Sequence, residues 1–159
     1  MQTASVTTVK KELKHLPKED LESLCLKLTK FKKENKEYIS YLLFESEFES
    51  EFIESVKNEV SILFQEINPD SYFYMKKTIR KILRLIKKYI RFSKIKSTEV
   101  ELLIHFCKEM NQVRPTIKRN AVLTNMYDRQ VEIIGKTIDK LHDDLQFDYR
   151  EDLEMLMGA

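Results

Sequence analysis

The sequence predicts an all-α protein, made of antiparallel helical hairpins that form a bundle or a short αα-array of about seven or eight helices. The chain of 159 residues has only two glycines and three prolines. Because hairpin turns and phosphate-binding loops need glycine, a β-sandwich or a P-loop fold is disfavoured. Apolar residues recur at spacings of three and four, and 42% of the residues are hydrophobic. We therefore expect one helical domain over residues 1–159, large enough to bury a core.

The first half of the chain predicts five helices, over residues of about 5–16, 18–33, 36–45, 48–67 and 70–93. Pro17 separates the first two, because the residue before a proline is driven out of the α region. Asn35 marks the next break. In the turn "NPDS", Asn68 or Asp70 can cap the fifth helix. The second helix carries one apolar stripe, formed by Leu21, Leu24, Leu28 and Phe31.

The second half predicts three more helices. Thr98 and Glu101 have the spacing of a capping box, so a sixth helix should start at "KSTEVE" and run to about residue 112. Residues 115–120 are expected to form a loop around a proline. A seventh helix should span about residues 121–145, and "DYREDLEMLM" should form a short last one.

The segment "MKKTIRKILRLIKKYIRFSKIK", residues 75–96, holds ten lysines and arginines and no acid. On a helical wheel its apolar residues cover about half of the circumference, which predicts a central helix with one solvent-facing side. The cations share the opposite arc. Those toward its middle are the candidate contacts for an acidic partner: Lys77, Arg80, Arg84, Lys88 and Arg91.

Three interpretations of this basic helix remain open. Residues 45–70 contain eight acids and one base, Lys57, so the preceding helix could neutralise the cationic side within the fold. Alternatively, the cations could bind an acidic protein or nucleic acid, or they could lie on a membrane surface. The aromatic segments "YISYLLF" and "SYFYM" are expected to belong to the core rather than to stack on bases.

The sequence contains no catalytic, cofactor-binding or metal-binding motif that we can identify. Glu101 and His105, or Asp139 and His142, could touch on a helix surface, but the chain lacks the two Glu-x-x-His pairs that a diiron helical bundle needs. The cysteines, Cys25 and Cys107, are expected to be buried free thiols of a reducing cytosol. No apolar run approaches the roughly 18 residues of a membrane helix, and no signal peptide is evident. We therefore expect a cytoplasmic protein that is not an enzyme.

The first hundred residues carry a "K-x-L-x-x-L" helix, a "KE-x-L" helix start and an "N-x-E-x-x-x-Y-L" segment before the lysine-rich helix. In these features the chain resembles a group of uncharacterised bacterial helical proteins. The resemblance implies an all-helical fold and no particular activity.

Two hypotheses of function follow from the sequence. The first is a protein–protein interaction or scaffolding module, including one that forms a homo-oligomer. The alternative is sequence-independent binding of nucleic acid through the basic helix 75–96.

Overall fold

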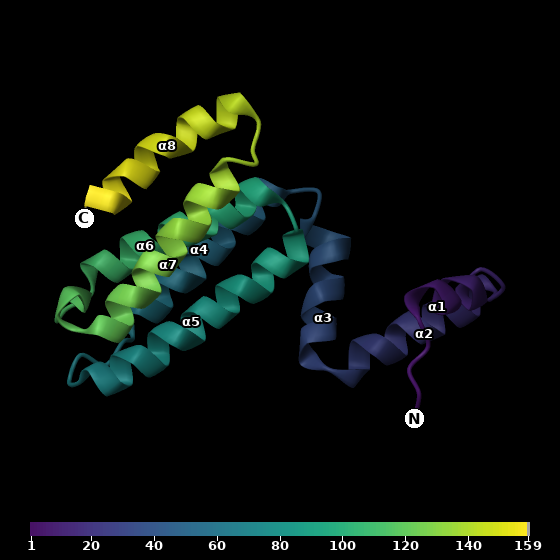
Figure 1. Cartoon of the computed structure of the whole chain (residues 1–159). Helices are drawn as coiled ribbons and strands as arrows, with labels where there is room; N and C mark the ends of the chain where they lie inside the picture. Colours follow the sequence, from purple (N-terminus) through teal and green to yellow (C-terminus); the bar gives the residue numbers. More distant parts are fainter. Residues whose placement is uncertain (159) are drawn as a thin grey trace. The chain divides into compact units, whose positions relative to one another are not determined.

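The computed structural model of the protein describes residues 1–158, and these residues form helices and turns but no strand (Figure 1). About 81% of the chain is helical, which confirms the predicted all-α class. The helices of the described chain are α1 (Val6–Leu13), α2 (Lys18–Phe31), α3 (Lys33–Ser40), α4 (Glu49–Gln65), α5 (Tyr72–Ser93), α6 (Lys96–Gln112), α7 (Ala121–Ile138) and α8 (Asp143–Gly158).

The chain divides into two compact units, Met1–Phe44 and Glu45–Ala159. This division differs from the single domain expected over residues 1–159. The physical reason is that the helices of the first unit, α1 to α3, bury no side chain completely. The first unit therefore has little buried core of its own.

The first unit consists of three helices followed by most of a π-helical turn, Tyr41–Glu45, whose last residue begins the second unit. Ser5 caps α1 by accepting a hydrogen bond from the Thr8 N–H, at 3.2 Å. The break between α2 and α3 lies at Lys32, whose backbone is extended, and not at Asn35 as expected. Asn35 instead lies inside α3, where its side-chain amide donates to the Leu28 carbonyl oxygen at 2.8 Å.

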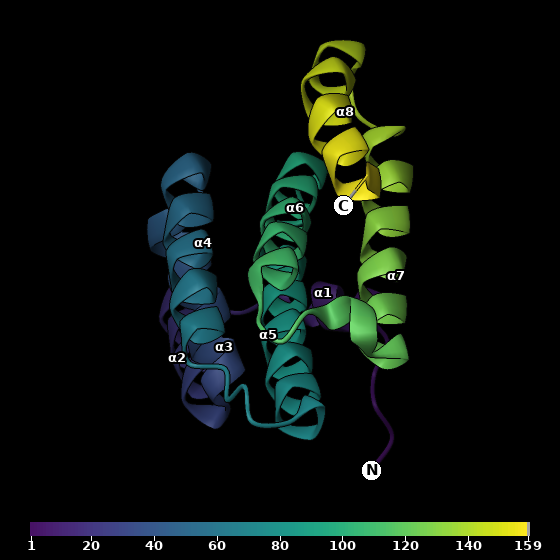
Figure 2. The ribbon, with the colours of Figure 1, turned by 90° about the vertical axis from the view of Figure 1, so that its left-hand side faces the viewer.

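The second unit is built around α6. Helix α4 packs against α5, α5 against α6, α6 against α7 and α7 against α8, and α6 also contacts α4 and α8. Figure 2 shows α4 on the left, α5 and α6 in the middle, and α7 with α8 on the right. Because α6 contacts all four other helices, it is the central helix of this unit.

The sequence explains why α6, and not α5, takes the central place. Its segment "VELLIHFC" is apolar on nearly every side of the helix, and such helices are buried all round. Its buried residues are Thr98, Val100, Leu102, Leu103, Ile104, Phe106, Cys107 and Met110. The expectation that the basic helix would be central was therefore wrong, although α5 does pack against two neighbours.

Two helix starts use different caps from those expected. Ser71 caps α5, with its Oγ 3.5 Å from the Tyr74 nitrogen, while Asn68 accepts from the Asp70 N–H within the preceding turn. Thr98 lies inside α6 rather than at its start, and its hydroxyl donates to Glu49 of α4 at 2.6 Å. A buried hydroxyl needs a hydrogen-bond partner, so this threonine joins two helices instead of capping one.

The last part of the chain also differs from expectation. Helix α7 ends at Ile138 rather than near residue 145, and α8 has 16 residues instead of being a short tail. Asp143 and Asp144 lie in the first turn of α8, where negative charge is favourable near the helix N-terminus. The expected loop over residues 115–120 follows a cis Arg114–Pro115 bond and contains a short 3-10 helix, Ile117–Arg119.

Candidate functional site

Helix α5 combines a buried apolar side with an exposed basic one. Met75, Ile79, Ile82 and Ile86 are completely or almost completely buried, in agreement with the apolar arc that the sequence predicted. The helix ends at Lys94, which adopts a left-handed conformation with a φ of 60°. A rigid helix of this kind fixes the direction in which its basic side chains point.

Five cations on the exposed side of α5 line one shallow groove of about 550 Å³. We call them the cationic face: Lys76, Lys77, Arg80, Arg84 and Lys87. The groove is completed by Phe73 and Leu83, so every lining residue belongs to α5. The surface is therefore an open, positively charged side of a single helix.

No residue of the cationic face has an acidic partner among residues 1–158. None of the five forms a hydrogen bond or an ion pair with another described side chain, and the same holds for Lys81. Exposed cations without acids nearby keep their positive potential for a ligand in solution. The cationic face is thus electrostatically open.

The acidic helix α4 does not neutralise this face. Its Glu59 accepts a hydrogen bond from the Tyr89 hydroxyl at 2.9 Å, and Glu54 pairs with Lys57 of its own helix. Glu49 accepts from Ser93 and Thr98. These acids lie against the C-terminal part of α5 or against α6. Glu66 lines a groove with Arg84 but forms no ion pair with it, so no acid of α4 pairs with the cationic face.

Only three of the five residues predicted from the sequence lie in the cationic face. Lys77, Arg80 and Arg84 are exposed and belong to the cationic face. Lys88 is half-buried and lies over the rings of Tyr89 and Phe92, with its Nζ 4.7 Å and 5.9 Å from the two ring centres. It lines a second groove together with Leu63 of α4, Glu66, which directly follows α4, and Arg84, which also belongs to the cationic face.

Arg91 is exposed but does not line the groove, whereas Lys76 and Lys87 do. The helical wheel placed Lys76 and Lys87 on the cationic arc, but away from its middle. The sequence analysis chose the cations farthest from the apolar side of the helix, and this criterion left out Lys76 and Lys87. The signal that could have found them is their spacing from Phe73 and Arg80 along one row of the helix.

Two of the three aromatic residues at the start of α5 are exposed, which contradicts their expected place in the core, whereas Tyr72 is half-buried and donates to the Thr116 carbonyl oxygen. Phe73 is 68% exposed and Tyr74 is 49% exposed, and their rings meet edge to face with centres 5.5 Å apart. The segment "YISYLLF" likewise buries only Tyr41, while Leu42, Leu43 and Phe44 are exposed. Aromatic content and helical spacing do not distinguish these surface positions from core positions.

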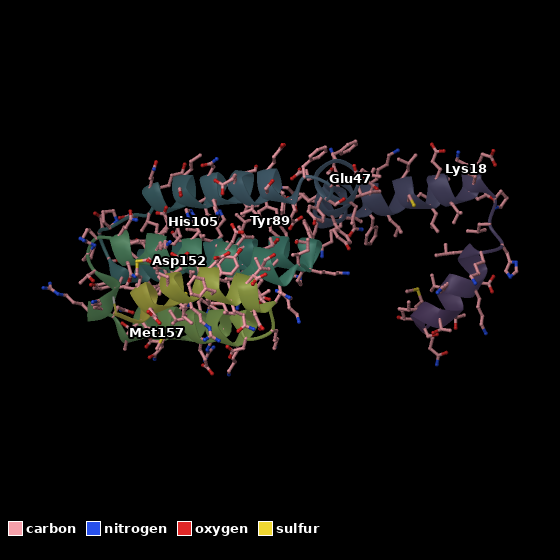
Figure 3. All side chains as sticks on the ribbon, turned by 90° about the horizontal axis from the view of Figure 1, so that it is seen from above. Lys18, Glu47, Tyr89, His105, Asp152 and Met157 are labelled. Atoms are coloured by element: carbon pink, nitrogen blue, oxygen red, sulfur yellow. The ribbon has the colours of Figure 1, made fainter. Side chains whose placement is uncertain are left out.

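A second polar cluster joins α4, α6 and α8. Lys57 pairs with Glu101 at 3.0 Å and with Glu54 at 2.9 Å, and the Tyr149 hydroxyl donates to Glu101 at 2.9 Å. Nearby, Lys108 pairs with Asp152 at 2.6 Å (Figure 3). Burial alone would lower the pKa of Lys57, but the two carboxylates outweigh it and raise this pKa. The cluster therefore keeps its charges paired and holds three helices in register.

His105 belongs to the same region, although its partners are not the expected ones. Its Nε2 lies 2.9 Å from Ser61 Oγ, 3.1 Å from the Lys57 carbonyl oxygen and 3.6 Å from Glu109. Burial lowers the pKa of His105, an effect that Glu109 only partly offsets. Glu101, four residues earlier, turns to Lys57 and Tyr149 instead. His142 lies near Asp144 rather than pairing with Asp139.

The grouping of Ser61, His105 and Glu109 is not that of a nucleophilic triad. A carbonyl oxygen can only accept, so the hydrogen of His105 lies on Nε2, the nitrogen that a base would need free for the serine. Ser61 donates its single hydrogen to Glu109 at 2.7 Å. These contacts fix α4 on α6, and the hydroxyl of Ser61 donates to a carboxylate rather than to a histidine nitrogen.

Two further observations bear on ligands. Within residues 1–158, no three His, Cys, Asp or Glu side chains are close enough to hold a metal ion. None of the described helices is sufficiently long and apolar to cross a bilayer.

Comparison of the chain with family models, with curated proteins and with solved structures gave no match.

Proposed function

We propose that the protein is a non-enzymatic binding module, and that the cationic face of α5 binds single-stranded nucleic acid without sequence preference. The observation that carries this proposal is the row of five cations without acidic partners beside the exposed ring of Phe73. Nucleic-acid binding is preferred over the other interpretations of the basic helix for two reasons, one of charge and one of shape.

The charge argument rests on the spacing of the cations. Lys77, Arg80, Arg84 and Lys87 follow one another at intervals of three or four residues, which is about 5 Å along a helix. Such a row can contact successive phosphates of one strand. Each contact releases a condensed counterion, which favours binding in a salt-dependent and sequence-independent way.

The shape argument concerns the aromatic ring at the start of the row. Phe73 lines the same groove as the five cations, so a strand whose phosphates follow the cations brings its bases near this ring. Stacking of an unpaired base on an aromatic side chain is a main source of affinity in single-strand binding proteins. In a duplex the bases are already stacked, so the ring favours a single strand.

A binding titration with three ligands tests the proposal. Labelled single-stranded DNA of mixed sequence, the same sequence as a duplex, and a poly-glutamate peptide should be compared by fluorescence anisotropy at low salt. We expect the single strand to bind most tightly and Arg80→Glu/Arg84→Glu to abolish its binding. Preferential binding of the peptide would assign the face to an acidic protein, and no binding of any ligand would refute the proposal.

The matched control is Arg129→Glu/Lys140→Glu. These two cations are also exposed and lie in or directly after α7, away from the cationic face, and their reversal changes the net charge by the same amount. The control variant should retain most of the affinity for the single strand. An equal loss in both variants would mean that only the total charge matters.

A second candidate function, protein–protein interaction, is supported by the first unit. Apolar side chains of this unit are exposed on α1 and α2, and the π-helical turn alone exposes Leu42, Leu43 and Phe44. Exposed apolar side chains that are grouped on one element are typical of interaction surfaces. The test of this candidate is the mass of the full chain in solution, alone and with added partners.

A further inference from the structure

The first unit leaves an apolar stripe on α2 only partly covered. The stripe, which we call the α2 seam, consists of Leu21, Leu24, Leu28 and Phe31, with spacings of three, four and three. Leu21 and Leu24 are half-buried, Leu28 is 54% exposed and Phe31 is 83% exposed. Alternating spacings of three and four place residues at the a and d positions of a heptad, the pattern by which two helices pack side by side.

The first unit cannot cover this seam itself. Its three helices bury no side chain completely, and among its described residues only Tyr41 is buried. Folded units of about 40 residues usually need a disulfide, a metal or an association to be stable. No disulfide is present in the described chain, because both cysteines are free. Association is the remaining means of burying the seam.

The charges along α2 indicate what kind of helix fits on it. Within α2, residues 18–24 carry three acids and one lysine, whereas residues 25–31 carry two lysines, Lys27 and Lys30, and no acid. A second α2 that runs antiparallel brings each half next to the oppositely charged half. A parallel arrangement would instead place like charges at the same level, which disfavours it.

We infer that two copies of this chain associate through their α2 seams, with the two helices antiparallel around a two-fold axis. In this register Leu21 lies at the level of the second copy's Phe31, and Leu24 at the level of the second copy's Leu28. Each contact then occurs twice, as in any two-fold interface. This inference deepens the second candidate function by naming the surface and the partner, and it is independent of nucleic-acid binding by α5.

The test measures molar mass by sedimentation equilibrium with the full chain. A seam of about three helical turns is a small interface, of the weak and transient class, so the protein concentration should range from about 5 µM to about 500 µM. We expect the wild-type mass to rise toward that of a dimer over this range. Leu28→Glu, which places a charge in the seam, should weaken dimerisation at least about tenfold.

Leu26→Glu is the matched control. Leu26 lies on the opposite side of the same helix and is 49% exposed, so it has nearly the same exposure as Leu28 and receives the same new charge. This variant should dimerise like the wild type. Far-UV circular dichroism of both variants shows whether the helices persist, and Phe31→Ser provides a second break in the seam if Leu28→Glu loses helix.

The antiparallel orientation has its own readout. Spin labels at Lys18→Cys, in a chain with Cys25→Ser, should lie at least about 20 Å apart along the axis of an antiparallel pair, because 16 residues separate their levels. Labels at the same level would refute the antiparallel arrangement. If both Leu28→Glu and Phe31→Ser still dimerise like the wild type, the α2 seam is not the interface, although the chain self-associates. A wild-type protein that is monomeric at about 500 µM would refute the inference as a whole.

Discussion

Replacing Ile86 by alanine tests how α5 is anchored and therefore whether its basic side is held outward. Ile86 is 0% exposed and lies on the apolar side of α5, opposite the cationic face. The substitution removes three carbon groups, each worth about 0.8 kcal/mol when buried, and it leaves a cavity that adds to the cost. We expect the free energy of unfolding to fall by about 3–4 kcal/mol.

Urea denaturation followed by tyrosine fluorescence measures this loss. The chain has no tryptophan, and five of its seven tyrosines (Tyr72, Tyr74, Tyr89, Tyr127 and Tyr149) lie in the second unit, so the signal reports mainly on the unit that contains α5. With an m-value of about 2 kcal/mol/M, the transition midpoint should fall by about 1.5–2 M urea with an unchanged slope.

The matched control is Ile62→Ala in α4, at a position that is mostly exposed. The same chemical change there should alter the stability by less than about 0.5 kcal/mol. If Ile86→Ala costs less than about 1 kcal/mol, the apolar side of α5 is not buried. The description of the cationic face as the outer side of an anchored helix would then be wrong.

Three further predictions concern the interior of the second unit. Burial raises the pKa of the Cys107 thiol to about 12. An aromatic disulfide reagent at pH 8 should therefore react quickly with the exposed Cys25 alone, and with both thiols only after unfolding. Rapid reaction of two thiols in the native protein would contradict the packing of α6. The pKa of His105 is lowered by burial, so below about pH 6.5 the unfolded chain takes up a proton that the folded chain excludes. The free energy of unfolding should therefore fall as the pH drops from 7.5 to 5.5, and it should fall less in His105→Gln. An equal fall in both proteins would show that His105 does not contribute. Tyr149→Phe removes the hydroxyl that donates to Glu101, and it should lower the free energy of unfolding, measured by urea denaturation, by about 1–2 kcal/mol. An unchanged free energy of unfolding would mean that this hydrogen bond does not help to hold α8 on α6.

Much of the fold could be predicted from the sequence because helix periodicity is a local property. The apolar arc of the basic helix placed Ile79, Ile82 and Ile86 in the core correctly, and α6 ends at the expected Gln112. The division into two units was not predicted. The apolar stripe of α2 is evident in the sequence, but the amphipathic pattern of a helix does not say which partner covers it.

The candidate site was predicted only in part, for a related reason. The cationic arc was evident, and Lys77, Arg80 and Arg84 lie on the exposed face. Whether the acids of α4 reach these cations depends on how α4 and α5 are rotated about their axes, which charge counts do not determine. The exposure of Phe73 depends in the same way on packing rather than on residue type.

The salt dependence of single-strand binding tests the central claim most directly. If the five residues of the cationic face each neutralise one phosphate, the logarithm of the binding constant should fall with the logarithm of the salt concentration with a slope of about −3.5. In Arg80→Ala/Arg84→Ala the slope should decrease in magnitude to about −2, because two counterion-releasing contacts are lost. A slope that is unchanged in this variant, or that is close to zero in the wild type, would contradict the assignment of the cationic face as a nucleic-acid-binding surface.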